Sequence, residues 1–539
     1  LNRIKCGSML LTNPQHDTMG MPDIDDDRFW WSLLILGCLL SIIAIGTSNL
    51  GLDTHLRMNA ANSDDGSLQW GHTRTVDPLA SDPDYTKVIE PQLVAQPTSY
   101  FYTISTSFIF AAGLAISGFV NPFETEEGKS VWSPRLPAII SIYPVFIYAI
   151  GRGYFEPIFA TIMALSIGVI GIIKVSKRST QAILLIISLS LVLYLKGIDV
   201  NVIFWFIIIG GIANNIGQFM DNKLSLKGDK ESPFQKPMLM AAVAFSSVTV
   251  LLLVAGMTGK GGTLSVIGDY PLYFLFALFG SFLDVIIIFG LFGMVFWPFV
   301  IPMLNNLKQI RSYNVSLLTS MCAGLLSSIW IYVAVLWTYE AQLWGENWPD
   351  IMWIMGNNAR YISLLIVPLF ALMAYTAKQF PEMPSLWSPK NKSKTLLLAI
   401  ILLLPLTFTA SLHGQQMWTD EAAEVLSESM EDGQQFVFIH EPTLAMHWLY
   451  TIRSDLDLDG QRNITGHWRA PDSGWQDELL NATQHPNRGD ISSIDFIVIS
   501  PKIETAIPDG WEILDQGKAP LLKGGELWTI WVKQLPLSN

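Results

Sequence analysis

The chain has 539 residues, of which 50% are hydrophobic and only 15% are charged, and its mean hydropathy is +0.36. About a quarter of the residues of a typical soluble protein are charged. This composition therefore excludes an ordinary soluble protein and indicates a polytopic membrane protein. The formal net charge of −13 argues against nucleic acid as a partner, because binding to phosphates needs an excess of Lys and Arg.

Apolar runs of about 17–25 residues, the length that crosses roughly 30 Å of hydrocarbon, recur along the chain. We predict about eleven membrane spans from these runs. The segment 268–303 is longer than one straight crossing, and Pro271 predicts a short interfacial helix ahead of the span itself. The predicted spans lie near residues 29–47, 100–120, 136–150, 154–173, 181–196, 200–218, 237–256, 275–303, 314–338, 359–377 and 395–411.

The basic residues are distributed unevenly between the loops that join these spans. If the N-terminus is cytoplasmic, the inner loops hold most of the Lys and Arg, as the positive-inside rule requires. The distribution of Lys and Arg agrees with the rule only if the number of spans is odd. The loop 48–99 and the tail are therefore both expected on the extracytoplasmic side of the membrane. We therefore predict a cytoplasmic segment 1–28, a membrane domain 29–411 and an extracytoplasmic domain 412–539, in a multi-pass protein of the cell membrane.

The tail reads as a second domain of the α/β class. The stretches "FVFIH" (436–440), "FIVIS" (496–500) and "LWTIWVK" (527–533) predict buried strands. Helical patterns at 418–430 and 443–453 lie before and between them, which favours a small layer of helices on a sheet.

The predicted outer loop 48–99 is much longer than most connections, and long loops tend to be functional or disordered. Its stretch "LDTHLRMNAA" has helical spacing and places Asp53 near the start of a helix, with His55 two residues later. Asp53 has two interpretations that the sequence leaves open. It is either a helix cap favoured by the backbone dipole, or a base or metal ligand at the rim of an outer cavity.

Two further stretches place charge at the predicted outer ends of spans. Arg152 and Glu156 stand at the end of the fourth span, and Arg360 and Tyr361 open the span that contains Pro368. A pair that merely reaches water at the interface explains Arg152 and Glu156 at small cost. The functional interpretation is a polar group facing the same cavity as Asp53, in which the fork of Arg360 suits a phosphate.

Together, these stretches resemble the GT-C superfamily of integral-membrane glycosyltransferases, and most closely the protein O-mannosyltransferase and aminoarabinose transferase type. Its members have a first span followed by a large outer loop with an acidic motif, and an outer C-terminal domain. They also have a span with Arg and an acidic residue at its outer end, and an Arg-Tyr pair that opens a Pro-containing span. The matching positions are Leu52-Asp53-Thr54-His55, Arg152 with Glu156, Arg360-Tyr361 with Pro368, and the aromatic stretch 270–296.

The resemblance implies inverting transfer of a sugar from a polyprenyl-phosphate donor to a protein, lipid or glycan acceptor at the outer face. Asp53, His55 and Glu156 would then be catalytic, and Arg152, Arg360 and Tyr361 would bind the donor phosphate. Many relatives have Asp-Glu where this chain has Asp53 followed by Thr54 and His55, so His55 takes the place of part of that motif. Asp82 and Asp84 are further carboxylates of the same loop, and Asp53 with His55 is the expected site if a divalent metal is used.

Two other classes of membrane protein compete with this interpretation. A transporter or flippase for a lipid-linked or polar solute has polar residues in the middle of its spans and internal repeats. Asp284, Asn214 and Asn215 lie in or near predicted spans, but the two halves of the chain show no similarity to each other. A receptor or scaffold that displays the outer domain needs no cluster of carboxylates at the outer face.

Overall fold

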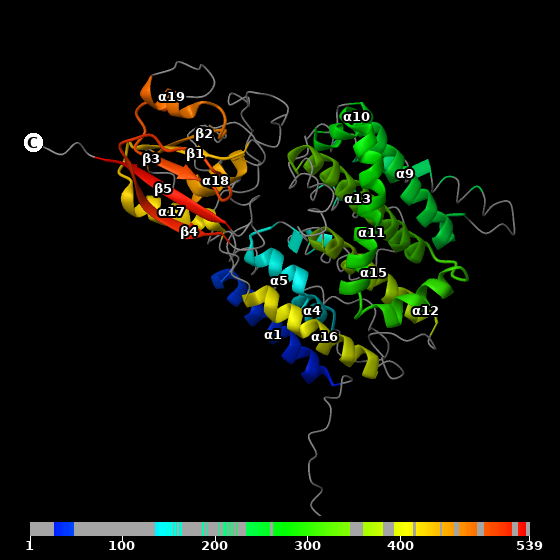
Figure 1. Ribbon diagram of the computed structural model, residues 1–539. Helices are drawn as coiled ribbons and strands as arrows, with labels where there is room; N and C mark the ends of the chain where they lie inside the picture. The colour runs from blue at the N-terminus through cyan, green and yellow to red at the C-terminus, as the bar shows by residue number, and fades with distance from the viewer. Residues whose placement is uncertain are drawn as a thin grey trace, which may run out of the picture.

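The computed structural model describes residues 26–47, 135–154, most of 156–163, scattered helical positions between 186 and 223, and residues 233–258, 262–344, 359–380 and 393–412. In the last part of the chain it describes 417–441, 445–456, 462, 464–481, 490–519 and 526–534. These parts are mostly helical and include one small sheet (Figure 1). Five of the described helices are long and apolar enough to cross a membrane, which fits a membrane protein.

The described helices before the sheet fall close to several predicted spans. The predictions at 29–47, 237–256, 314–338 and 395–411 each coincide with a candidate membrane helix. The predicted spans at 100–120, 154–173, 181–196 and 200–218 lie wholly or partly outside the described residues. The helices are α1 (Asp27–Thr47), α4 (Arg135–Ser141), α5 (Pro144–Gly151), α9 (Pro237–Met257), α10 (Val266–Asp269), α11 (Pro271–Phe292), α12 (Trp297–Leu307), α13 (Tyr313–Trp344), α15 (Ala359–Gln379) and α16 (Ser393–Leu412).

Two predicted spans are wrong as single helices. The span predicted at 275–303 is divided between α11 and α12, which are separated by a turn at 293–296. A short helix, α10, does precede Pro271, but α11 begins at that proline and not several residues later. The span predicted at 136–150 consists of the short helices α4 and α5.

The break between α4 and α5 follows from Pro144, which is the first residue of α5 and has no backbone N–H to donate. Tyr143, directly before it, is extended with φ −73° and ψ 119°, the conformation that a following proline favours. The Thr407 hydroxyl of α16 donates to the Ile142 carbonyl at 2.6 Å. This hydrogen bond satisfies a carbonyl at the break, as an interruption of an apolar helical segment requires.

Helix α1 packs against α4, α5 and α16 through close backbone contacts. The Ser411 hydroxyl of α16 donates to the Leu40 carbonyl of α1 at 2.6 Å. At Gly37 of α1, a Cβ atom would lie 2.3 Å from the Ser141 Oγ atom of α4, so only glycine permits this approach. These contacts fix α4 and therefore α5, whose C-terminal end carries Arg152.

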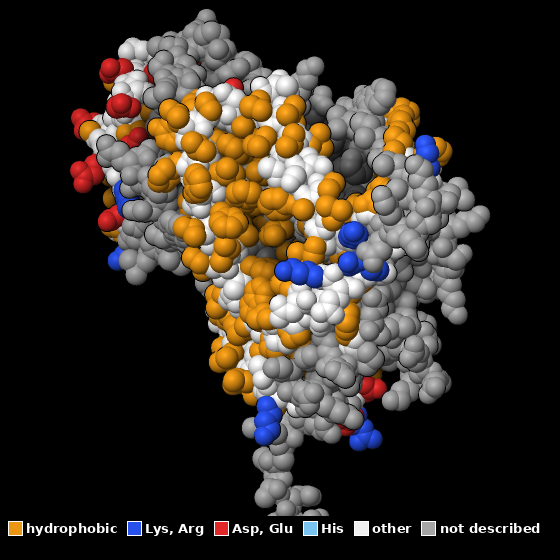
Figure 2. Space-filling view, turned by 90° about the vertical axis from the view of Figure 1, so that its right-hand side faces the viewer, with side chains coloured by type: hydrophobic (Ala, Val, Ile, Leu, Met, Phe, Trp, Pro, Cys, Tyr) orange, Lys and Arg blue, Asp and Glu red, His pale blue; other side chains and the backbone are white. Residues whose placement is uncertain are grey.

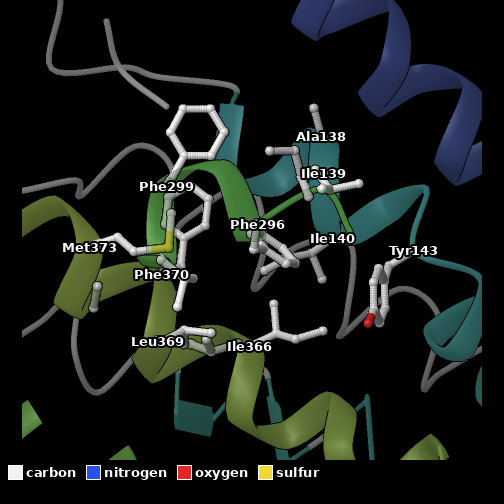
Figure 3. Close-up of a cluster of buried hydrophobic side chains, with 14 of the residues drawn as sticks. Ala138, Ile139, Ile140, Tyr143, Phe296, Phe299, Ile366, Leu369, Phe370 and Met373 are labelled. Carbon is white, nitrogen blue, oxygen red and sulfur yellow. The ribbon is translucent and has the colours of Figure 1, made fainter. Parts of the chain in front are cut away.

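The main hydrophobic core lies where the α4–α5 break, the α11–α12 turn and α15 meet (Figure 3). The rings of Phe296 and Phe370 pack edge to face with centroids 6.3 Å apart, and Tyr143 contacts Phe296 at 6.4 Å. Residues from three segments that are far apart in sequence thus share one packed cluster, which holds α5 and α15 side by side.

Helices α9 and α11 expose many large hydrophobic side chains, and Figure 2 shows a broad hydrophobic surface on one face of the molecule. Monomeric soluble proteins rarely expose so extended an apolar surface, whereas a lipid-facing helix requires one. The backbone N–H of Ser312 donates to the Gln235 carbonyl at 3.2 Å. This bond brings Lys236, at the start of α9, and Arg311, before α13, to the same end of the helical part.

The later part of the chain forms a five-stranded sheet with the strand order β2-β1-β3-β5-β4. Strand β1 pairs in parallel with β2 and β3, and β5 pairs antiparallel with β3 and β4. The three predicted strands are confirmed as β1, β3 and β5, whereas β2 and β4 were not predicted. The strands are β1 (Gln435–Ile439), β2 (Thr465–Arg469), β3 (Phe496–Ile499), β4 (Trp511–Lys518) and β5 (Leu527–Lys533).

Helices cover both faces of this sheet. Helices α17 (Trp418–Ser429) and α18 (Ala445–Leu456) pack on the face that carries Phe436 and Phe438. Helix α19 (Trp475–Leu480) packs on the other face through Trp475. The predicted helices at 418–430 and 443–453 are confirmed as α17 and α18. Because α17 begins shortly after α16 ends at Leu412, its first turn stays close to the end of the helical part.

Candidate functional site

Arg152 is placed by the C-terminal end of α5. It is the C-cap residue, and its backbone N–H donates to the Tyr148 carbonyl at 3.2 Å. Gly153 then adopts a left-handed conformation with φ 70°, which glycine permits at little cost, and the N–H of Tyr154 turns back to the Ala149 carbonyl at 2.9 Å. The Arg152 guanidinium lies 5.0 Å from the centre of the Tyr148 ring, and only 5% of the residue is exposed.

Arg360 lies in the first turn of α15 and is surrounded by three side chains. Its Nε atom is 3.8 Å from Oε1 of Glu156, and its Nη2 atom donates to the Tyr361 hydroxyl at 2.5 Å. Its guanidinium lies 4.1 Å from the centre of the Tyr154 ring and 4.7 Å from that of Tyr361. Arg360 is 6% exposed and Glu156 is 2% exposed, so the whole group is buried.

The structure therefore brings three of the predicted site residues, Glu156, Arg360 and Tyr361, together and adds Tyr154 to them. The prediction grouped Glu156 with the catalytic residues. Its carboxylate oxygen Oε1 lies 3.8 Å from Arg360 Nε, so it balances the charge of that guanidinium. The remaining predicted residues, Asp53 and His55 with the secondary pair Asp82 and Asp84, lie outside the described residues.

The position of Arg360 is not explained by helix stability. A cation at a helix N-terminus is disfavoured by the backbone dipole, by about 0.3–1 kcal/mol when exposed. The same dipole and the free backbone N–H groups of the first turn favour an anion there. A guanidinium fork beside such a helix end is suited to bind a phosphate through paired hydrogen bonds.

The structure also contains two buried acidic residues on α17 and α18 that the sequence analysis missed. Burial raises the pKa of Asp420 on α17, while a hydrogen bond with Asp455, the Met417 N–H and the charge of Arg152 act to lower it. Burial, together with the neighbouring Asp420 charge, raises the pKa of Asp455 on α18 to about 9. Asp420 could have been noticed from its place in the first turn of a predicted helix just after the last span. Asp455 carries no such signal.

The described residues include no group of three or more His, Cys, Asp or Glu side chains that could hold a metal ion. The predicted metal ligands Asp53 and His55 are not among these residues, so a metal at that position stays a prediction.

Searches of protein-family models, curated protein sequences and solved structures found no match to this chain.

Proposed function

We propose that this protein is a membrane glycosyltransferase of the GT-C type that takes a sugar from a polyprenyl-phosphate donor. The observation that carries the proposal is the buried group at the start of α15, where Arg360 meets Glu156, Tyr154 and Tyr361. A buried guanidinium at a helix N-terminus is an unfavourable arrangement for the protein alone, and it becomes favourable when an anion binds. The phosphate of the donor is the anion that the proposed reaction supplies.

In the proposed reaction, a hydroxyl or amide of a protein, lipid or glycan acceptor attacks the anomeric carbon of the sugar. The bond between that carbon and the phosphate oxygen breaks with inversion, and the lipid phosphate leaves with the electron pair. Arg360 stabilises the negative charge on the leaving phosphate, assisted by Arg152. Asp53 takes the proton of the acceptor as general base, with His55 beside it.

The topology proposed with this function places the N-terminus in the cytoplasm and residues 412–539 outside the cell membrane. The excess of Lys and Arg in the predicted inner loops supports it. Cysteine accessibility in intact cells tests it, with Glu428→Cys on α17 and Lys223→Cys, both at exposed positions. A membrane-impermeant thiol reagent should label the first position only, and labelling of the second position alone would reverse the topology.

The activity is tested by sugar transfer from a panel of polyprenyl-phosphate sugars, with the full-length protein in lipid nanodiscs. Arg360→Lys keeps the charge but loses the paired donors, so we expect it to lose at least about 90% of the activity. Arg311→Lys, at an exposed position before α13, is the matched control and should transfer at the parent rate. If Arg360→Lys transferred sugar at the parent rate, the proposed role of the guanidinium fork in binding the phosphate would be wrong.

A transporter or flippase is the second candidate, and one observation favours it. Asp284 lies in the middle of the candidate membrane helix α11 and is only 7% exposed, as expected for a polar residue on a transport pathway. Solute or lipid-linked sugar flux in proteoliposomes, without transfer to any acceptor and lost in Asp284→Asn, would favour this candidate over the transferase.

A further inference from the structure

The C-terminal end of α5 forms a Schellman motif. The N–H of Gly153 donates to the Ile150 carbonyl at 3.1 Å, and the N–H of Tyr154 donates to the Ala149 carbonyl at 2.9 Å. Gly153 has the left-handed conformation, with φ 70°, that this motif requires. The chain therefore reverses directly after Arg152, and Tyr154 returns to the side of α5.

This reversal brings two tyrosine rings together. Tyr148, in the last turn of α5, and Tyr154 lie with their ring centroids 6.4 Å apart and their planes at 48°. The separation is within the range of favourable aromatic pairs. A contact between side chains at these two positions often accompanies a Schellman motif, so helix termination alone explains the tyrosine pair. It does not explain why each ring also contacts a guanidinium.

Each ring of the pair contacts one arginine of the candidate site. The Arg152 guanidinium lies 5.0 Å from the centre of the Tyr148 ring, which is four residues earlier on the same helical face. The Arg360 guanidinium, from α15, lies 4.1 Å from the centre of the Tyr154 ring. Both arginines and Tyr154 are at most 6% exposed, whereas Tyr148 is partly exposed. The tyrosine pair thus links two cations from segments that are far apart in sequence.

A ring over a guanidinium stabilises the cation in a different way from a carboxylate. The N–H donors of Arg lie in the plane of the guanidinium, so a ring over its face attracts the charge without accepting any of these hydrogen bonds. The attraction is strongest where water is excluded, as it is around the buried Arg360. Such a contact restrains the plane of the guanidinium and leaves its edge to polar partners. That edge is the part that binds a phosphate through paired hydrogen bonds.

We propose that Tyr148 and Tyr154 are positioning residues of the candidate site, which together hold Arg152 and Arg360 for the phosphate of the donor. This inference rests on the proposed function, because the rings have this role only if the arginines bind a phosphate. Tyr154 contributes more than Tyr148, because its ring is buried and lies closer to its guanidinium.

Two substitutions of Tyr154 separate the effect of the ring from that of the hydroxyl. Binding of a polyprenyl phosphate is measured with the full-length protein in lipid nanodiscs. Tyr154→Leu removes the aromatic face and should weaken binding roughly tenfold, whereas Tyr154→Phe keeps that face and should stay within about twofold of the parent. Tyr273→Leu, at an exposed position of α11, is the matched control and should bind with the parent affinity. Equal losses in Tyr154→Leu and Tyr154→Phe would overturn the proposal.

Sugar transfer distinguishes positioning from a merely structural role of Tyr154. A structural defect lowers the amount of active protein but leaves the affinity of the folded protein unchanged. We therefore expect Tyr154→Leu to raise the KM for the polyprenyl-phosphate sugar and to leave the KM for the acceptor unchanged. A loss of active protein in Tyr154→Leu, with the donor KM of the parent, would overturn the positioning role.

Double-mutant cycles test whether each ring acts through its arginine. Tyr154→Leu should weaken phosphate binding little further when Arg360→Gln is already present, because the group that the ring holds is gone. Tyr148→Leu should weaken binding about twofold to fivefold in the parent and should have little effect beside Arg152→Gln. Additive losses in the two cycles would overturn the proposal.

The binding assay also separates failure of this inference from failure of the proposed function. If the parent and Tyr154→Leu bound a polyprenyl phosphate equally well, the positioning role would be wrong and the proposed function would stand. If the parent bound no polyprenyl phosphate and transferred no sugar from one, the proposed function would be wrong and the positioning role would be wrong with it.

Discussion

The approach of α1 to α4 at Gly37 gives a prediction whose size follows from the structure. A Cβ atom added at Gly37 would lie 2.3 Å from the Ser141 Oγ atom and 2.5 Å from the Ser141 backbone carbon and oxygen. A side-chain atom could move aside, but the backbone of α4 is held by the packing of α4 and α5. We therefore expect Gly37→Ala to cost about 1–3 kcal/mol of unfolding free energy, the range for overpacking a core.

The matched control lies on the same helix. At Gly46 of α1, an added Cβ atom meets nothing within 4 Å. Gly46→Ala should therefore show only the better helix propensity of Ala, a gain of at most about 1 kcal/mol. The two variants, which are identical in composition, should thus differ by about 1–4 kcal/mol.

The measurement is unfolding of the full-length protein in detergent, followed by tryptophan fluorescence. A lower apparent unfolding temperature for Gly37→Ala than for the parent, with no loss for Gly46→Ala, is the expected result. Gly37→Ala should also weaken the proposed sugar transfer, because α4 leads directly into α5 and Arg152. Equal stability of the two variants would refute the close approach of α1 to α4 and the positioning argument built on it.

Two further predictions concern the sheet and its helices. Glu478→Gln should cost about 3–5 kcal/mol because it removes the carboxylate that lies 2.8 Å from the guanidinium of Arg469, a residue that is only 1% exposed. Asp432→Asn changes the exposed ion pair with Arg462 and should cost less than about 1 kcal/mol. Both variants are measured by the same thermal unfolding assay. Equal losses of stability in Glu478→Gln and Asp432→Asn would contradict the role of burial. Burial lowers the pKa of His440 to about 3, so stability should be lost as the pH falls below the unfolded value, by up to about 1.4 kcal/mol per pH unit. His440→Gln should remove this loss of stability at acid pH. If the difference in unfolding free energy between His440→Gln and the parent were the same at every pH, protonation of His440 would not be linked to folding.

The elements that the sequence predicted well are those whose signal is local. A long apolar run specifies a candidate membrane helix, and a run such as "FIVIS" specifies a buried strand, because burial on both faces needs apolar residues at every position. Strand β4 was missed because most of its residues, in "WEILDQGK", are exposed at the sheet edge. Strand β2 was missed because "TGHWR" contains Gly, His and Arg, and its buried Arg469 has Glu478, on a later helix, as an ion-pair partner.

The errors in the helical part have a different cause. The segment 136–150 is apolar throughout, so its hydropathy does not indicate the break at Pro144. The break is tolerated because Thr407, distant in sequence, donates to the Ile142 carbonyl. The sequence also placed Glu156 beside Arg152 in one motif, and it could not show that Glu156 lies 3.8 Å from Arg360, about two hundred residues later in the chain. Periodicity and motif spacing describe one segment at a time and cannot specify which distant segment supplies the partner.

The charges of the candidate site are themselves an argument about function. Removing a guanidinium and a carboxylate from water costs several kcal/mol per ion, and a buried ion pair often stabilises a protein less than apolar residues of the same volume would. Arg360 and Glu156 are nevertheless buried beside two tyrosine rings, and Arg152 is buried against the ring of Tyr148. Stability alone would favour apolar side chains at these positions. A buried guanidinium with an acidic partner is instead suited to an anion that enters and leaves, because the carboxylate balances the cation whenever the anion is absent.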